Sequence, residues 1–257
     1  MTMKTVSYGA HPHQVGDLYL PEGATAPAPV VCLLHGGFWR LPHGRDEMQP
    51  VALDLAARGF AVWNIEYRRV GDGGGWPATV DDVAAAIDHL ATLATQGLPV
   101  DLRRVATAGH SAGGHLALWA AKRADRRADE RGPRVVRVAA AVGLAPVADL
   151  AYVHGISSGD GAVARFLDTV PEADAPLWRC ASPIDMLPLG VPQLVLHGED
   201  DDVLPIEVSR RYAKAAAEAG DAIDFIELEG AGHMEFVDPR SAAHDELCAW
   251  LGSGLQT

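Results

Sequence analysis

Short apolar runs alternate with amphipathic segments along the chain. Residues 5–8 and 15–20 predict a short antiparallel pair of strands, and a turn-rich connector over residues 21–27 follows them. Because helical patterns lie between the later apolar runs, we predict βα units around a mostly parallel sheet, which is the α/β fold class. The apolar runs that are typical of buried strands are residues 30–34, 60–65, 105–108, 135–144, 194–196 and 223–228.

The segments between these runs carry helical spacing. Val80, Val83, Ile87 and Leu90 recur every three or four residues and mark one apolar stripe of a helix. An alanine-rich stretch at residues 112–124 predicts a second helix. Two more helices are predicted, at residues 208–216 with Gly220 as a stop signal and at residues 240–251.

Residues 149–190 break this regular pattern. The segment carries several glycines and prolines together with aromatic side chains, Trp178 among them. Because an excursion of this length in a compact fold usually has a function, we predict a small lid or cap over the site. The alternative is a surface insertion with no role in binding.

Length and composition narrow the class of protein. The 257 residues suit one α/β domain spanning residues 1–257, and a net charge of −13 argues against nucleic acid and anionic membranes as partners. No apolar stretch is long enough for a signal peptide or a bilayer span, so we expect a cytoplasmic protein. Three widely spaced cysteines suggest neither a disulfide framework nor a metal site, and we expect no metal.

The stretch from Gly109 to Gly113 reads Gly-His-Ser-Ala-Gly and lies between a predicted strand and a predicted helix. This is the context that a nucleophile elbow requires, with Ser111 raised on a sharp turn. Side chains two residues to either side of the serine would collide with the neighbouring strand and helix, so both positions are glycine. The pattern predicts Ser111 as a nucleophile.

Serine needs a general base and a third group that holds the base. His233 follows the strand at residues 223–228 by a few positions, and we predict that it is the base. The acid belongs to an acidic turn that follows the strand at residues 194–196. Asp201 is the first choice there, then Asp202, then Asp200. A calcium loop is the rival reading of this turn, but its spacing does not fit.

The segment from His35 to Trp39 directly follows the strand at residues 30–34. Its glycines free the backbone N–H groups to face an oxyanion, and the amide of Ala112 is a further expected donor. All these loops follow parallel strands, whose carboxyl ends meet at one edge of a sheet. An aromatic side chain at Trp39 could line an acyl pocket or could pack in the core.

Residues 30–251 resemble an α/β-hydrolase. The resemblance rests on His35-Gly36-Gly37, on the elbow around Ser111, on the turn from His197 to Pro205 and on the Gly232-His233 pair, all in the family's order. It implies Asp201 as the acid and the amides of Gly37 and Phe38 as oxyanion donors. Because Phe38 replaces a third glycine, we expect a narrower pocket. The same motifs are similar to those of kynurenine formamidases and of feruloyl and acetyl-xylan esterases.

The combined expectation is a cofactor-free serine hydrolase that cleaves small carboxylic esters through an acyl-enzyme. One alternative is an arylformamidase that acts on N-formylkynurenine-like aryl formamides, and another is a non-catalytic ligand-binding member of the fold. The expected partner is a small ester or amide, and the sequence does not specify the oligomeric state. Side chains expected to contact the substrate are Trp39, His110 and Trp178.

Overall fold

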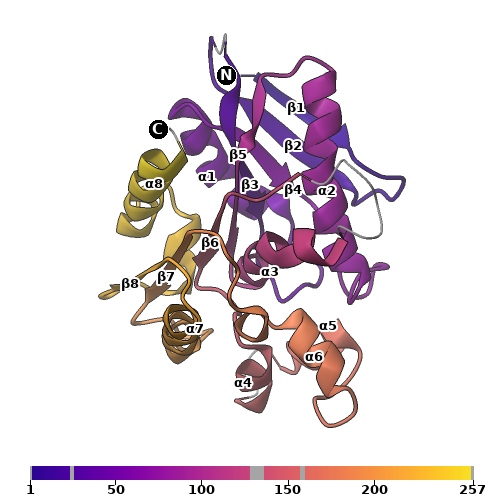
Figure 1. Ribbon diagram of the computed structural model, residues 1–257, viewed down its shortest axis with the longest axis vertical. Coiled ribbons are helices and arrows are strands. Elements are labelled where there is room, and N and C mark those ends of the chain that lie inside the picture. The colour runs from indigo at the N-terminus through magenta and orange to yellow at the C-terminus, as the bar shows by residue number, and fades with distance from the viewer. Residues whose placement is uncertain (1, 24–25, 128–135, 157–159, 256–257) are drawn as a thin grey trace.

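The computed structural model describes residues 2–23, 26–127, 136–156 and 160–255, without the side chains of residues 124–127. Within that part of the chain, one sheet has the strand order β1-β2-β4-β3-β5-β6-β7-β8 (Figure 1). The β1–β2 and β2–β4 pairs are antiparallel, and the strands from β4 to β8 are parallel to one another. The strands are β1 (Thr2–Ser7), β2 (Val15–Leu20), β3 (Ala28–Leu34), β4 (Ala61–Ile65), β5 (Val100–His110), β6 (Ala140–Leu144), β7 (Gln193–Gly198) and β8 (Ile223–Leu228).

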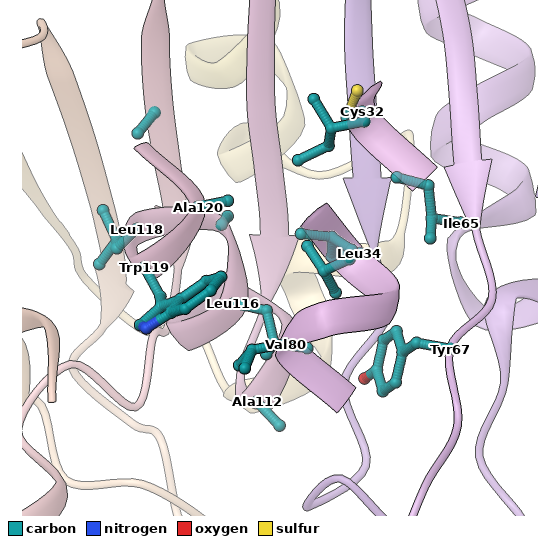
Figure 2. Close-up of a cluster of buried hydrophobic side chains, with 14 of the residues drawn as sticks. Cys32, Leu34, Ile65, Tyr67, Val80, Ala112, Leu116, Leu118, Trp119 and Ala120 are labelled. Carbon is teal, nitrogen blue, oxygen red and sulfur yellow. The ribbon is translucent and has the colours of Figure 1, made fainter. Parts of the chain in front are cut away.

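Helices cover both faces of the sheet, because successive strand residues point to opposite sides. In β3, Val30, Cys32 and Leu34 pack on one face, while Val31 and Leu33 pack on the other. Figure 2 shows part of the first layer, where strand side chains meet the helices. The first face is covered by α2 (Ala78–Thr95), α3 (Ala112–Arg127) and α7 (Glu207–Glu218), and the second by α1 (Gln49–Ala57) and α8 (Ala242–Leu255).

The predicted α/β class is confirmed, and so is each predicted strand and helix, with shifted ends. Two strands show the largest errors: the one predicted at residues 105–108 runs from Val100 to His110, and the one predicted at residues 135–144 begins at Ala140. Residue 135 lies outside the described residues, and the backbone of Val136 pairs with side chains instead of a strand. Its N–H donates to Asp88, and its carbonyl accepts from Arg123. The helix α1 was not predicted.

The segment at residues 149–190 forms short helices beyond the carboxyl edge of the sheet (Figure 1). Asp149 and Asp174 cap two of them, each accepting a hydrogen bond from a backbone N–H three residues later. Its role as a lid and the single-domain organisation stay predictions. The elements are α4 (Leu150–Gly155), α5 (Ala162–Leu167), α6 (Ala175–Ala181) and η2 (Pro183–Met186).

Among the described residues, every helix is too short or too polar to cross a lipid bilayer.

The junction of β3, β5 and α3 leaves no room for side chains at two glycines. A Cβ atom at Gly113 would lie 2.1 Å from the carbonyl oxygen of Leu34, and one at Gly109 would lie 2.2 Å from the carbonyl oxygen of Gly113. These contacts are far inside the van der Waals limit and involve backbone atoms, which cannot rotate away. The start of α3 is therefore packed directly against the end of β3.

We predict that Gly113→Ala lowers the free energy of unfolding by about 1–3 kcal/mol or more, because backbone must move to admit the methyl group. Urea unfolding followed by circular dichroism measures the change. The matched control is Gly254→Ala in α8, where no atom lies within 4 Å of the place that the new methyl group would take. Since alanine favours helix over glycine by up to about 1 kcal/mol, the control should be neutral or stabilised. Equal stability of the two variants would contradict the packing argument.

Candidate active site

Ser111 occupies the turn between β5 and α3 with a left-handed backbone, at φ 55°. Such a conformation is costly for a residue other than glycine and is a mark of functional sites. Hydrogen bonds hold it: the Ser111 N–H donates to the Leu144 carbonyl at 2.8 Å, and the Ser111 carbonyl accepts from Val147. The Ser111 hydroxyl makes no hydrogen bond to another described residue.

The loop at residues 35–39 lies against this turn. A Cβ atom at Gly36 would be 3.3 Å from the Cβ of Ser111. Three consecutive residues of the loop have positive φ: Gly37 at 96°, Phe38 at 55° and Trp39 at 54°. No described residue accepts a hydrogen bond from the backbone N–H of Gly37, Phe38 or Ala112. Unpartnered donors beside a serine are the arrangement that can bind an oxyanion.

Side chains hold this loop from both ends. The His35 ring stacks on Tyr67 at 4.2 Å between ring centroids, and its Nε2 lies 2.9 Å from a carboxylate oxygen of Glu66. Trp39 stacks on Phe166 of α5 at 4.5 Å, and its indole N–H donates to His115 Nδ1 of α3 at 3.2 Å. The strained loop conformation is therefore imposed by packing on both sides.

Asp201 and His233 are directly paired. His233 Nδ1 lies 2.6 Å from Asp201 Oδ2, and the Asp201 side chain is fully buried. Asp201 Oδ1 accepts hydrogen bonds from the backbone N–H groups of Val203 and Leu204. Asp202, in contrast, is exposed. Burial alone would raise the pKa of Asp201, but hydrogen bonds from His197 and His233 outweigh it and hold that pKa well below its usual range.

Two further histidines hold this pair, and neither was predicted to do so. His110 Nε2 donates to the backbone carbonyl of His233 at 2.9 Å, and the two rings lie 4.6 Å apart. His197 Nε2 contacts Asp201 Oδ2 at 3.2 Å, while its Nδ1 lies 2.7 Å from the hydroxyl of Ser209. Burial lowers the pKa of His110 to about 3, so this histidine is neutral at physiological pH.

An apolar pocket opens at Ser111. Two of its walls are the predicted site residues Phe38 and Trp39. The cavity that water can enter is about 10 Å³, which is room for roughly one water molecule. It is therefore a narrow site for a small apolar group. Its remaining lining residues are Val147, Val153, Ala162, Val163, Val203 and Leu204.

The structure pairs Asp201 with His233 and places Ser111, Phe38 and Trp39 around one pocket. Trp178 packs on His154 at 5.2 Å and does not line that pocket. His115 and His197 are partners that sequence reasoning missed. For His197 the only signal was its place at the start of the acidic turn. For His115, no local pattern could reveal that it contacts Trp39, 76 residues away.

Known proteins resemble this chain along most of its length. Esterase LipC of Mycobacterium tuberculosis is 32% identical over 248 residues, which cover 90% of this chain and 59% of LipC. A probable isoprenylcysteine alpha-carbonyl methylesterase ICME of Oryza sativa is 28% identical, covering 95% of this chain and 61% of the relative. The chain therefore spans about six tenths of the length of these curated relatives. A kynurenine formamidase of Danio rerio matches only 45% of this chain, at 28% identity.

Solved structures show the same fold. A truncated carbohydrate esterase from gut microbiota superimposes with a TM-score of 0.88 at 21% identity, covering 100% of this chain and 97% of that one. Thermogutta terrifontis esterase 2 gives a TM-score of 0.79 at 23% identity, covering 98% and 92% of the two chains. The fold is thus that of the α/β-hydrolases. Since the BD-FAE family model matches residues 16–215, well over half of the chain, the protein belongs to the BD-FAE family.

Proposed function

We propose that this chain is a carboxylesterase that hydrolyses small carboxylic esters through an acyl-enzyme on Ser111. The observation that carries the proposal is the buried hydrogen bond between Asp201 and His233, on the side of the molecule where the elbow, the unpartnered amides and the apolar pocket meet. The esterase relatives support the same reaction class.

His233 serves as the general base in this proposal. Its Nδ1–H donates to Asp201, which leaves the lone pair of Nε2 available for the proton of Ser111. As that proton leaves, Ser111 Oγ bonds to the ester carbonyl carbon.

The imidazolium that forms on His233 then protonates the leaving alcohol as the carbon–oxygen bond of the ester breaks. Asp201 stays ionised, orients the ring and stabilises its positive charge. Water next attacks the acyl carbon while His233 takes one of its protons. The bond between the acyl carbon and Ser111 Oγ then breaks, His233 returns the proton to Oγ, and the carboxylic acid leaves. The low pKa of Asp201 supports its assignment over the exposed Asp202.

The amides of Gly37, Phe38 and Ala112 are assigned to the oxyanion. Each N–H lacks a partner among the described residues, so each can donate to the carbonyl oxygen as it becomes negative. Such donors stabilise the transition state more than the neutral ester, which is what accelerates the reaction. The strain at Phe38 and Trp39 is consistent with this use, because it turns the amides out of local pairing.

His110 and His197 are positioning residues in this scheme. Although His110 was expected to contact substrate, its contact with the His233 carbonyl favours a supporting role. His197 orients the Asp201 carboxylate and is itself held by Ser209. Trp39 keeps its predicted place at the substrate, as a pocket wall. A substrate contact by Trp178 stays a prediction.

The size of the pocket supports esters with short acyl groups. Its walls are entirely apolar apart from Ser111, so a small hydrocarbon group is the matched occupant. We assign Val153 of α4 and Ala162 and Val163 of α5 to a lid, since the segment at residues 149–190 supplies these walls. A cytoplasmic location stays a prediction.

Arylformamidase activity is the second candidate function. It needs the same nucleophile and oxyanion donors, and the formyl group would fit the narrow pocket. The partial match to a kynurenine formamidase is its support. The bulkier aromatic part would then have to lie outside the pocket. A non-catalytic role has less support, since no predicted catalytic residue is missing from the chain.

We predict that Ser111→Ala lowers kcat on p-nitrophenyl acetate by about 10⁶, as the loss of a triad serine does elsewhere. The exposed Ser253→Ala in α8 is the control and should keep full activity. Mass spectrometry of the native enzyme quenched during turnover should find an acetyl group on the peptide that contains Ser111. A loss of less than tenfold would remove Ser111 from the mechanism.

We also predict a preference for short esters. kcat/KM should fall by about tenfold or more from p-nitrophenyl acetate to the octanoate, because the long chain does not fit the pocket. Val163→Ala should reduce the difference in kcat/KM between the two esters, because the smaller side chain widens the pocket. N-formylkynurenine in the same assay tests the rival, and a higher kcat/KM on that compound than on any ester would make the protein a formamidase.

A third prediction concerns Asp201 and stability. Its pKa is lowered in the folded protein, so the ionised carboxylate contributes stability above the unfolded pKa of about 4, and this contribution is lost as pH falls further. At pH 7, Asp201→Asn should lose about 1–3 kcal/mol of unfolding free energy relative to the wild type. The difference should shrink below about pH 4. Urea unfolding at each pH measures it, and the exposed Asp202→Asn is the control. A constant difference down to pH 2 would contradict the assignment.

A further inference from the structure

A second polar cluster lies between α1 and α8, among residues that the proposed mechanism does not use. It consists of Asp54 on α1 and of His244 and Cys248, one turn apart, on α8. We propose that Asp54, His244 and Cys248 form a binding site for a thiophilic divalent cation, with zinc as the best match. The site would join two helices that cover the same face of the sheet (Figure 1).

The spacing of the three donor atoms suits zinc. Asp54 Oδ2 and His244 Nε2 lie 2.7 Å apart, His244 Nε2 and Cys248 Sγ 3.3 Å, and Cys248 Sγ and Asp54 Oδ2 3.9 Å. Tetrahedral zinc, with bonds of about 2.1 Å to nitrogen and oxygen and 2.3 Å to sulfur, holds its donors about 3.4–3.6 Å apart. Each separation therefore needs to change by less than about 1 Å.

The kinds of donor select the metal. A thiolate and an imidazole favour zinc and similar transition metals over magnesium or calcium, which take oxygen ligands. The side chain of His244 is fully buried, whereas that of Asp54 is 32% exposed. The described residues thus supply three ligands and leave the fourth position of a tetrahedral zinc without a protein ligand. Water can occupy that position.

Arg58 carries a positive charge beside the proposed site, so its guanidinium must move away from Asp54 when a metal binds. Its guanidinium pairs with the same oxygen of Asp54 that contacts His244. The Arg58 side chain is 46% exposed, so water can solvate its guanidinium when the metal replaces it at Asp54. Because its positive charge repels a cation nearby, removing it should tighten metal binding. If the ion pair between Arg58 and Asp54 only stabilised the fold and no metal bound there, removing Arg58 would not change zinc binding.

Binding releases protons. Burial raises the pKa of the Cys248 thiol to about 11, so the thiol is protonated at neutral pH and gives up one proton as its sulfur bonds to the metal. His244 Nε2 must offer its lone pair in place of the N–H that it now donates to Asp54. That proton moves to Nδ1, a buried atom without a partner among the described residues. Metal affinity should therefore rise with pH.

The test starts from protein stripped with a chelator and returned to chelator-free buffer. Equilibrium dialysis against zinc should find a tight site in the wild type, and Cys248→Ser should weaken it at least tenfold. His244→Gln should do the same. Cys180→Ser, on α6, removes a cysteine outside the cluster and should bind zinc as the wild type does. Arg58→Gln should bind several times more tightly.

Cobalt gives a readout that depends on the sulfur. Cobalt(II) added to the stripped wild type should produce a thiolate-to-cobalt charge-transfer absorption, absent in Cys248→Ser and present in Cys180→Ser. Thermal unfolding of each variant without metal shows that it is folded, and zinc should raise the midpoint of the wild type but not that of Cys248→Ser. Equal zinc binding by wild type and Cys248→Ser would place the metal on other histidines, and this result or no tight binding would overturn the proposal.

Discussion

The direct backbone contact between the end of β3 and the start of α3 is the constraint on which the candidate site depends. Gly113 lets the helix approach the carbonyls of Leu34 and His35, and Gly109 lets the strand approach the helix. The loop at residues 35–39 begins at that point, so its amides and Ser111 are brought to the same place by main-chain packing. Side-chain contacts then hold the loop and Ser111 in this arrangement.

Buried polar bonds then make the arrangement rigid. Trp39 donates to His115 Nδ1, and His115 Nε2 donates to the carbonyl of Ala181 at the end of α6. Burial lowers the pKa of His115 to about 4, so the ring stays neutral and can accept and donate at once. The loop at residues 35–39, the helix α3 and the segment at residues 149–190 are thereby tied through one imidazole. At the start of the loop, Glu66 holds the His35 ring through a hydrogen bond from its Nε2.

The sheet could be predicted because its central strands are buried on both faces and read as unbroken apolar runs, as β3 does. The strand prediction was wrong at residues 136–139. There the side chains of Asp88 and Arg123, distant in sequence, take the hydrogen bonds of the Val136 backbone. Six of the nine residues of α1 are apolar, and they do not form the one-sided stripe that would distinguish a helix from another short apolar run.

Motif order named both members of the Asp201–His233 pair, although their catalytic roles stay predictions. Long-range partners were beyond such reasoning. His110 meets a carbonyl 123 residues away, and Asp54 meets an imidazole 190 residues away. No local pattern specifies which carbonyl or carboxylate a histidine will reach, because tertiary packing decides that. The expectation of no metal rested on local patterns, namely the spacing of the cysteines and of the acidic turn, and such patterns do not compare residues as distant in sequence as Asp54 and His244.

Trp39 both lines the pocket and holds the loop at residues 35–39, so a substitution at this position would affect both. Its ring is a wall of the pocket, while its backbone and indole N–H fix the loop that carries the amides. A smaller side chain there would admit larger substrates and loosen the loop in the same step. Val153, Ala162 and Val163 also line the pocket, and among the described residues their side chains make no hydrogen bond to that loop. Substitutions at these three positions should therefore change the width of the pocket without loosening the loop, as long as Phe166 of α5 keeps its stack on Trp39.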